Sequence, residues 1–290
     1  MVTRSANVRY RRHMLNWGSV GKLGRRTPGD RASAPASLVH DWILETAIAR
    51  EQVDVLFQPL IAPRTGRVIG AEALARSPIA PCAVDLFARA VAGGLEERLS
   101  RLVQRKALRA AALWEGPLRA LGLSINLLPQ EICRAGFDQW LLDEISAVGI
   151  DPRRVTVEIT ENALLVDQMA VAARLTRLRD AGISIAVDDF GTGYASLAYL
   201  IALPLDMIKI DRGLIAGLVG GERDRIVVRA MIRLARELDL KVVIEGVEST
   251  AQLALLAEWG CDLYQGFIGA GALTQDELTR FVATAEIQAA

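Results

Sequence analysis

The sequence predicts an α/β fold, a TIM-like (β/α)8 barrel whose first strand runs antiparallel to the others. Short β-branched or apolar runs alternate with amphipathic stretches after about residue 41, as expected of successive β/α units. Eight such runs fit one barrel, which typically needs about 250 residues. The first two runs are joined only by Ala62–Gly66, which is too short for a crossover helix and therefore predicts an antiparallel pair.

In chain order, the predicted strands are Val53–Gln58, Val68–Leu74, Leu121–Leu127, Val155–Ile159, Ile183–Val187, Met207–Ile210, Lys241–Ile244 and Asp262–Gln265. Apolar residues at helical spacing predict helices over Val84–Ala92, Glu97–Trp114, Phe137–Val148, Val166–Ala181, Glu222–Leu238, Ala251–Trp259 and Gln275–Ala285. A doubly wound open sheet is the structural alternative, but neither the G-x-G-x-x-G fingerprint nor a P-loop is present.

Charge divides the chain into two parts. Lys+Arg and Asp+Glu each number 34, and a net charge of zero argues against a general polyanion binder or a specific nucleic-acid polymer as partner. Residues 1–31, however, contain eight basic residues and one acid, a net charge of +7, so the remainder carries −7. We predict a basic, disordered tail over 1–40 and a barrel over 41–290. The tail is either a solvated extension or a docking segment for an acidic partner, a nucleic acid or a membrane surface.

Several function classes are excluded by composition. The two histidines, His13 and His40, lie in or beside the tail, so the barrel has no imidazole for Ser-His-Asp or Cys-His catalysis. Three widely spaced cysteines indicate neither a disulfide framework nor a thiolate metal site. No apolar run is long enough for a membrane span, and no secretory signal is evident, so we expect a cytoplasmic protein.

Each predicted strand ends with a polar residue, and the carboxyl ends of barrel strands converge on one mouth. A single such residue is ordinarily a helix cap or a solvated turn, but eight are hard to explain as capping. In strand order they are Gln58, Glu72, Asn126, Glu158, Asp188 with Asp189, Lys209 with Asp211, Glu245 and Gln265.

This set predicts a site for hard divalent cations. Five carboxylates and one amide provide oxygen ligands only, which select Mg²⁺, Mn²⁺ or Ca²⁺. Five like charges in one mouth would repel strongly without a counter-cation. Adjacent Asp188 and Asp189 can serve two neighbouring ions, a pair suited to phosphoester hydrolysis. Lys209 would add positive charge for the attacking water or the phosphate, and Arg76 can bind a phosphate with two donors.

The run Asp189-Phe190-Gly191-Thr192-Gly193 contains the kinase-like triplet D-F-G, but no H-R-D or V-A-I-K motif accompanies it, so we reject a kinase. Gly191 and Gly193 instead predict a mobile or tightly turned loop beside the metal site. Glu161 could anchor that loop or cap a helix.

Eight ordered blocks resemble the EAL-domain cyclic di-GMP phosphodiesterases over residues 45–285. The blocks are Phe57-Gln58-Pro59, Glu72-Ala73-Leu74-Ala75-Arg76, Ser124-Ile125-Asn126, Glu158-Ile159-Thr160-Glu161, Asp188–Gly193, Ile208-Lys209-Ile210-Asp211, Glu245-Gly246-Val247-Glu248 and Gln265-Gly266-Phe267.

The resemblance implies an enzyme that opens cyclic di-GMP to linear pGpG with two Mg²⁺ or Mn²⁺ ions. It also implies a role for each matching residue. The metal ligands would be Glu72, Asn126, Glu158, Asp188, Asp189 and Glu245; Lys209, Glu245 and Glu248 would serve catalysis; Gln58, Arg76 and Gln265 would meet the substrate; Glu161, Asp211, Gly191 and Gly193 would support the loop and the site.

The chain departs from the family at two places on the mouth rim. Ser77 stands where members usually carry Trp, and the segment from there to Gly94-Leu95 is shorter than usual. The run 268–272 replaces the usual Phe-Ser-Arg/Lys-Pro-like stretch. Both changes bear on contacts to the nucleotide rather than on the metal ligands.

Two other functions compete with the enzyme. The first is an inactive EAL domain that acts as a cyclic di-GMP receptor or a protein-interaction module, but the chain keeps the metal ligands and the lysine that degenerate members typically lose. The second is an unrelated barrel enzyme that abstracts a proton beside a carboxylate, with Lys209 as base. Family members often form homodimers. We expect no G-G-D-E-F cyclase or sensory domain before the barrel, because about 40 residues cannot hold one.

Overall fold

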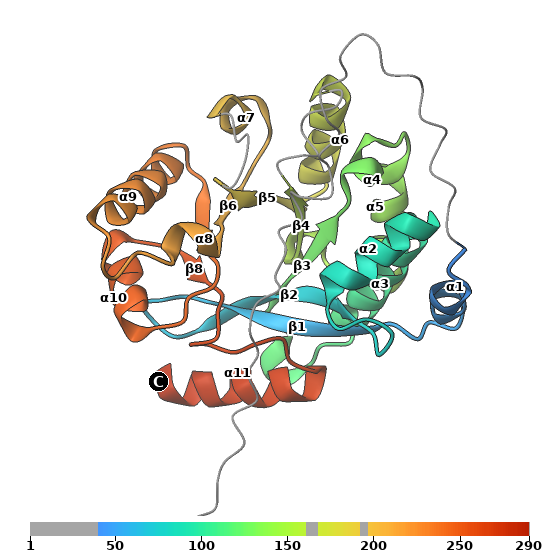
Figure 1. The fold of residues 1–290 in the computed structure, drawn as a ribbon, viewed down its shortest axis with the longest axis horizontal. Coiled ribbons are helices and arrows are strands. Elements are labelled where there is room, and N and C mark those ends of the chain that lie inside the picture. The colour runs from blue at the N-terminus through green and yellow to red at the C-terminus, as the bar shows by residue number, and fades with distance from the viewer. Residues whose placement is uncertain (1–39, 161–167, 192–196, 290) are drawn as a thin grey trace, which may run out of the picture.

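The computed structural model describes residues 40–160, 168–191 and 197–289 as a closed eight-stranded barrel surrounded by helices (Figure 1). The strands follow one another around the barrel in chain order, which confirms the predicted fold class and excludes the open sheet. They are β1 (Asp54–Ile61), β2 (Val68–Arg76), β3 (Gly122–Leu127), β4 (Val155–Thr160), β5 (Ser184–Phe190), β6 (Met207–Ile210), β7 (Lys241–Ile244) and β8 (Leu263–Tyr264).

The direction of β1 is the irregular feature of the barrel. β1 pairs antiparallel with β2 on one side and with β8 on the other, while every pair from β2 to β8 is parallel. The short 62–66 turn forces this arrangement, as the sequence predicts. Both strands extend beyond their predicted ends, β1 to Ile61 and β2 to Arg76.

Helices follow most strands and cover the outside of the barrel (Figure 1). Those that the periodicity predicts are α2 (Ala83–Gly93), α3 (Glu96–Ala112), α5 (Phe137–Val148), α6 (Gln168–Asp180), α9 (Glu222–Glu237), α10 (Thr250–Trp259) and α11 (Gln275–Ala289). The prediction lacked α1 (Trp42–Ala49), α4 (Pro129–Cys133), α7 (Leu197–Ala202), α8 (Arg212–Ile215) and the 3₁₀ turns η2 (Gly116–Leu118) and η3 (Pro152–Arg154). Most of these are too short to show a helical period.

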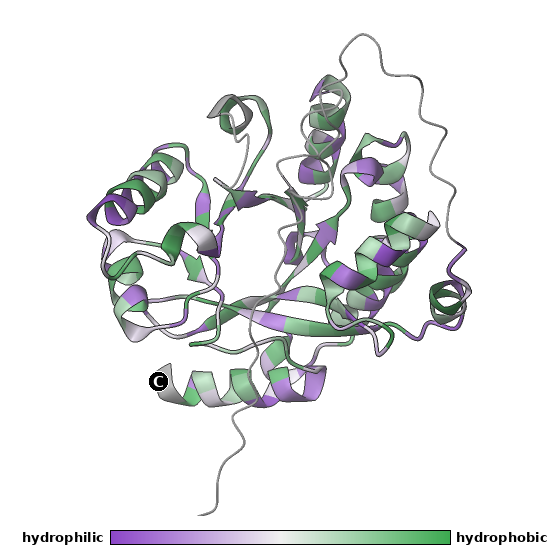
Figure 2. Ribbon diagram, in the orientation of Figure 1, coloured by the Kyte–Doolittle hydropathy of each residue, from purple (hydrophilic) through white to green (hydrophobic). Residues whose placement is uncertain are grey.

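Two of the three apolar clusters lie on opposite faces of the barrel strands. Outward-facing residues such as Ile185, Ile208 and Val242 pack with the covering helices in the main core. Inward-facing residues make a smaller cluster inside the barrel, consisting of Leu60, Ala186, Met207, Val243 and Leu263. Because successive side chains of a strand point to opposite faces, each strand can supply both cores. In Figure 2 the helices carry both hydrophobic and hydrophilic colour, as expected for elements with one buried side.

The predicted tail falls almost entirely outside the described residues, and its boundary with the barrel stays a prediction. Within the described ranges, no helix combines the length and apolarity needed to cross a membrane. The three cysteines are free thiols, as their spacing predicts.

Phe57 tests the contact between β1 and the outer helices. It is 2% exposed and meets Trp114 edge-on, with ring centroids 5.3 Å apart. We expect Phe57→Ala to lower the free energy of unfolding by about 3–5 kcal/mol, because it leaves a cavity in the main core. Phe267, which is 70% exposed, offers a matched control, and Phe267→Ala should cost about 0.5 kcal/mol or less. Equal losses in denaturant unfolding would contradict this assignment of the core.

Candidate active site at the mouth of the barrel

The alternation of the strands places a polar layer above the inner apolar cluster. On four consecutive strands an inward apolar residue is followed two positions later by a polar one, so both point into the barrel. Two pairs lie within their strands: Ala186 and Asp188 on β5, and Met207 and Lys209 on β6. In the other two the polar member directly follows the strand: Val243 of β7 with Glu245, and Leu263 of β8 with Gln265. The polar members of these pairs form one level of side chains at the mouth.

β1 also contributes to this layer, but because β1 is antiparallel its polar residue comes before its inward apolar residue in the sequence. On β1 the polar residue Gln58 comes two positions before the inward Leu60, and it pairs across the strands with Glu72 of β2. Gln58 and Glu72 therefore lie within their strands, although the sequence placed them at strand ends. Glu72 still reaches the polar layer, where it contacts Lys209 and Gln265, and its pairing with Gln58 places Gln58 at the same level.

A bulge explains how two successive acids both serve the mouth. In a regular strand Asp188 and Asp189 would point to opposite faces. Between Val187 and Phe190 the register of β5 with β6 shifts by one residue, and Asp189 has φ +55°. A bulge of this kind redirects a side chain, and a left-handed backbone outside glycine is strained. One carboxylate oxygen from each of Asp188, Asp189 and Glu245 lies within 4.8 Å of the others.

These side chains open onto a cavity of about 650 Å³. Its acidic end includes Glu72, Asp188, Asp189 and Glu245, and its other end is walled by apolar residues of the β2–α2 region and α3, among them Phe87 and Val103. The predicted residues Gln58, Arg76, Asn126, Asp211 and Gln265 also line it.

Lys209 forms the base of the acidic end. Its ammonium is 1% exposed and lies 2.7 Å from carboxylate oxygens of both Glu158 and Glu245. Oxygens of Glu72 and Asp188 are 3.2 Å and 3.3 Å away. One buried cation is therefore shared by four of the five predicted acidic ligands.

The pKa values of these groups respond to the crowding. Burial raises the pKa of Glu72, but the Lys209 ammonium and the amide donors of Asn126 and Gln265 outweigh it and lower this pKa below its ordinary value. Burial and the Glu72 carboxylate raise the pKa of Glu158 to about 8, even though Lys209 opposes the shift. Burial, Asp188 and Asp211 raise the pKa of Asp189 to about 7.

The residues fit a hard divalent cation. The donors are oxygens, and burial together with neighbouring carboxylates raises the pKa values of Glu158 and Asp189 although Lys209 opposes both shifts. The Oε1 atom of Glu158 is buried, and no donor among the described residues reaches it. A buried oxygen without a partner is costly, and a bound cation would remove that cost.

The three predicted substrate contacts all line the cavity, and their roles stay predictions. Arg76 lines the cavity while one of its guanidinium nitrogens donates to Ala75 O at 2.8 Å. Gln265 lines it too, but its amide donates to Glu72 at 3.2 Å, so it supports a ligand. Gln58 donates to Ala270 O at 3.2 Å and thereby holds the 268–272 segment, one of the departures from the family.

Asp211 caps α8 by accepting from Gly213 N at 2.7 Å, in keeping with a supporting role. Glu248 is exposed and is not among the residues that line the cavity, and its catalytic role stays a prediction. Gly191 has φ +97°, and a Cβ there would come within 2.6 Å of Leu214, which explains the glycine at this tight turn. Glu161 and Gly193 lie outside the described residues.

The sequence reasoning missed three buried polar residues behind Asn126. Ser100 and Gln104 of α3 line the cavity, and Glu131 of α4 accepts hydrogen bonds from both. Ser100 and Gln104 are one helical turn apart on a buried stripe that otherwise holds Leu99, Leu102, Ala107, Leu108 and Ala111. Two polar residues in an apolar stripe are the signal that could have identified them.

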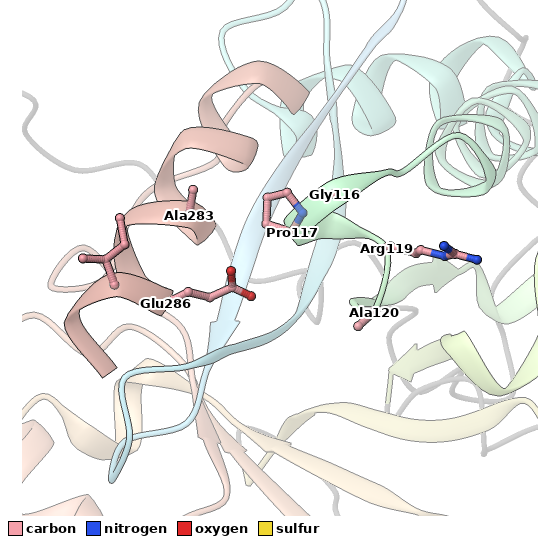
Figure 3. Close-up of a pocket in the computed structure, with 7 residues that line it drawn as sticks. Gly116, Pro117, Arg119, Ala120, Ala283 and Glu286 are labelled. Carbon is pink, nitrogen blue, oxygen red and sulfur yellow. The ribbon is translucent and has the colours of Figure 1, made fainter. Parts of the chain in front are cut away.

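A second depression lies between η2 and α11 (Figure 3). Its lining includes Pro117, Arg119 and Glu286, and η2 precedes β3, so it lies at the opposite end of the strands from the mouth. It is shallow, and its lining resembles an ordinary exposed surface rather than a site for chemistry.

A (β/α)8 barrel with one reversed strand and a carboxylate-lined mouth defines the class of this domain. The family model described as EAL domain matches residues 42–271, and the chain belongs to this family. This confirms the resemblance seen in the sequence blocks.

Known relatives extend this assignment. The cyclic di-GMP phosphodiesterase NbdA of Pseudomonas aeruginosa is 34% identical over 255 residues, which are 85% of this chain and 32% of NbdA. An uncharacterised protein of Azorhizobium caulinodans is 40% identical over 231 residues, 76% of this chain and 31% of that protein. The chain thus spans about a third of the length of these relatives.

Solved structures agree with the fold and the family. The PaMucR phosphodiesterase in complex with c-di-GMP superposes with a TM-score of 0.76 at 33% identity, over 81% of this chain and 97% of PaMucR. Klebsiella pneumoniae BlrP1 with manganese and cyclic di-GMP gives a TM-score of 0.70 at 31% identity, over 77% of this chain and 56% of BlrP1.

The raised pKa values predict a pH dependence of stability in metal-free protein. Glu158 has a pKa of about 8 in the folded chain against an ordinary 4.5, and Asp189 about 7 against 3.8. For each carboxyl, at a pH between its ordinary pKa and its raised pKa, the folded chain binds more protons than the unfolded chain. The free energy of unfolding therefore falls as pH rises through this range. In EDTA-treated protein we expect a fall of more than about 1 kcal/mol between about pH 5 and pH 8, since one pKa unit corresponds to about 1.4 kcal/mol.

Glu158→Gln should flatten this slope, because the amide does not titrate. The exposed Glu237 on α9 gives a control, and Glu237→Gln should keep the wild-type slope. Urea unfolding at several pH values measures both. Wild-type stability that rises from about pH 5 to pH 8 would contradict the charge crowding at the mouth.

Proposed function

We propose that this chain hydrolyses cyclic di-GMP to linear pGpG in the mouth of its barrel, with two divalent cations, Mg²⁺ or Mn²⁺. The observation that carries the proposal is the group of four carboxylates gathered around buried Lys209 in a chain of the EAL family. A relative named as a cyclic di-GMP phosphodiesterase and a related structure in complex with c-di-GMP support the choice of substrate.

The residues that would hold the cations are Glu72, Asn126, Glu158, Asp188, Asp189 and Glu245. When bound, such ions lower the pKa of an attacking water and stabilise the charge that develops on a phosphodiester. They would also offset negative charge where an anionic dinucleotide must enter, which a mouth of five carboxylates and one lysine does not do alone.

The remaining groups would orient the substrate. Arg76 lines the same cavity as the acidic residues, and its planar guanidinium suits a phosphate group. The apolar end, with Phe87 and Val103, offers walls for the flat faces of a base. Lys209 would draw the carboxylates together and oppose the rise of their pKa values rather than contact the nucleotide, because it is buried beneath them.

Turnover tests the proposal directly. We expect the purified chain, incubated with cyclic di-GMP and Mg²⁺ or Mn²⁺, to yield pGpG on chromatography, and EDTA to stop the reaction because the ligand oxygens lose their ions. No product with either ion, together with retained nucleotide binding, would favour the receptor function instead.

Asp188→Asn tests the site without changing its size. The amide keeps the shape but loses a charge that cation binding needs, so we expect turnover to fall by more than about 100-fold, beyond the usual cost of removing a supporting residue. Asp143 on α5 accepts a hydrogen bond at an exposed position, and Asp143→Asn should keep wild-type turnover. Wild-type rates for Asp188→Asn would refute the ligand assignment.

A further inference from the structure

A buried polar network lies directly behind Asn126. Asn126 is the penultimate residue of β3, and its side chain donates to Glu72 Oε1 at 2.8 Å. Its backbone carbonyl accepts from Gln104 Nε2 of α3 at 3.0 Å. The same amide nitrogen also reaches Ser100 Oγ at 3.0 Å and Glu131 Oε2 at 3.2 Å.

Glu131 gathers the rest of the network. Its Oε2 atom accepts from Ser100 Oγ at 2.8 Å and from the backbone N–H of Leu128 at 2.9 Å. Leu128 is the N-cap residue of α4, two residues after Asn126. The segment from Asn126 to Leu128 is therefore held at its first carbonyl by Gln104 and at its last N–H by Glu131.

Burying this polar network lowers the stability of the fold relative to apolar side chains in the same space. Ser100, Gln104 and Glu131 are 3%, 1% and 2% exposed. Burial raises the pKa of Glu131 despite its three donors. The Oε1 atoms of Gln104 and Glu131 are both buried, and within the described ranges neither has a partner. Buried acceptors without partners destabilise a fold, and apolar side chains of similar shape could replace the whole set at little cost.

The position of the network gives it a use other than stability. Elsewhere on this buried stripe α3 carries apolar residues, and the polar pair occurs only where the stripe passes the β3–α4 turn. Partners that orient a metal ligand are commonly buried, hydrogen-bonded groups one shell away from the ion.

We propose that Ser100, Gln104 and Glu131 are positioning residues that fix Asn126 in the geometry the divalent site requires. This inference rests on the proposed function for the identity of the site, and it adds three residues that act through Asn126. The network fixes the position of the Asn126 backbone through its carbonyl. The side-chain amide of Asn126 is then placed to donate to Glu72 and to offer its oxygen to the cation.

Mn²⁺ binding by the full-length chain, measured by calorimetry without nucleotide, tests the proposal. We expect Gln104→Leu to weaken Mn²⁺ binding about 10-fold or more, as is typical when a group supporting a metal ligand is lost. Its melting temperature in EDTA should stay within about 5 °C of wild type, because the leucine also removes a buried unpaired acceptor. Gln139→Leu, the same change at an exposed position of α5, should leave both quantities unchanged.

Glu131 supplies the conservative comparison. Glu131→Gln keeps an oxygen that accepts from Ser100 and Leu128, and it should bind Mn²⁺ nearly as well as wild type. Glu131→Leu should weaken binding as Gln104→Leu does and speed hydrogen exchange at the Leu128 amide in metal-free protein. Ser100→Ala removes one hydroxyl from the network and serves if a leucine variant fails to fold.

The outcomes separate this inference from the proposed function. A wild-type chain that binds Mn²⁺ but does not hydrolyse cyclic di-GMP would refute the function, and the Mn²⁺ affinities of the variants would still decide the role of the network. Folded Gln104→Leu or Ser100→Ala with wild-type Mn²⁺ affinity, or a wild-type chain without Mn²⁺ affinity, would overturn the positioning role.

Discussion

The contact between the Lys209 ammonium and four carboxylates is the interaction on which the mouth of this barrel depends. Glu72, Glu158 and Asp188 reach that one cation from three different strands, and Glu245 reaches it from the position directly after β7. The lysine draws acids together that would otherwise repel, but one positive charge cannot balance them. Burial and the neighbouring carboxylates raise the pKa values of Glu158 and Asp189 despite this lysine, so a divalent cation bound in the mouth would relieve the crowding.

The barrel produces this arrangement by simple alternation. Apolar residues at one inward level make the inner core, and polar residues two positions further along the same strands make the mouth. This is why the sequence predicted so much: a period of two and the positions of the strands place Lys209 and Glu245 together without any knowledge of packing. The reversal of β1 also followed from sequence, because the 62–66 turn is too short for a helix.

Other features needed information that a linear pattern does not contain. The bulge that lets Asp188 and Asp189 share the mouth depends on the register between β5 and β6, which is set by tertiary packing. α4 and α8 span only five and four residues, which is too short for a repeating helical pattern of apolar residues to be recognised. The predicted place of Glu248 came from a motif, and the structure leaves its side chain exposed. Ser100 and Gln104 can be recognised in the sequence as polar residues on the apolar face of α3. They are easily overlooked, because the strong amphipathic pattern of the helix suggests that its polar residues face solvent.

The environment of Lys209 also decides between the readings of its role. A lysine that abstracts a proton must be neutral, with a pKa near the working pH. Burial alone would lower the pKa of Lys209, but Asp188, Glu158, Glu245 and Glu72 raise it well above its ordinary value. An ammonium held charged by four carboxylates is a donor and a counter-charge, not a base. The structure therefore disfavours the proton-abstracting barrel enzyme, which agrees with the membership of the chain in the EAL family.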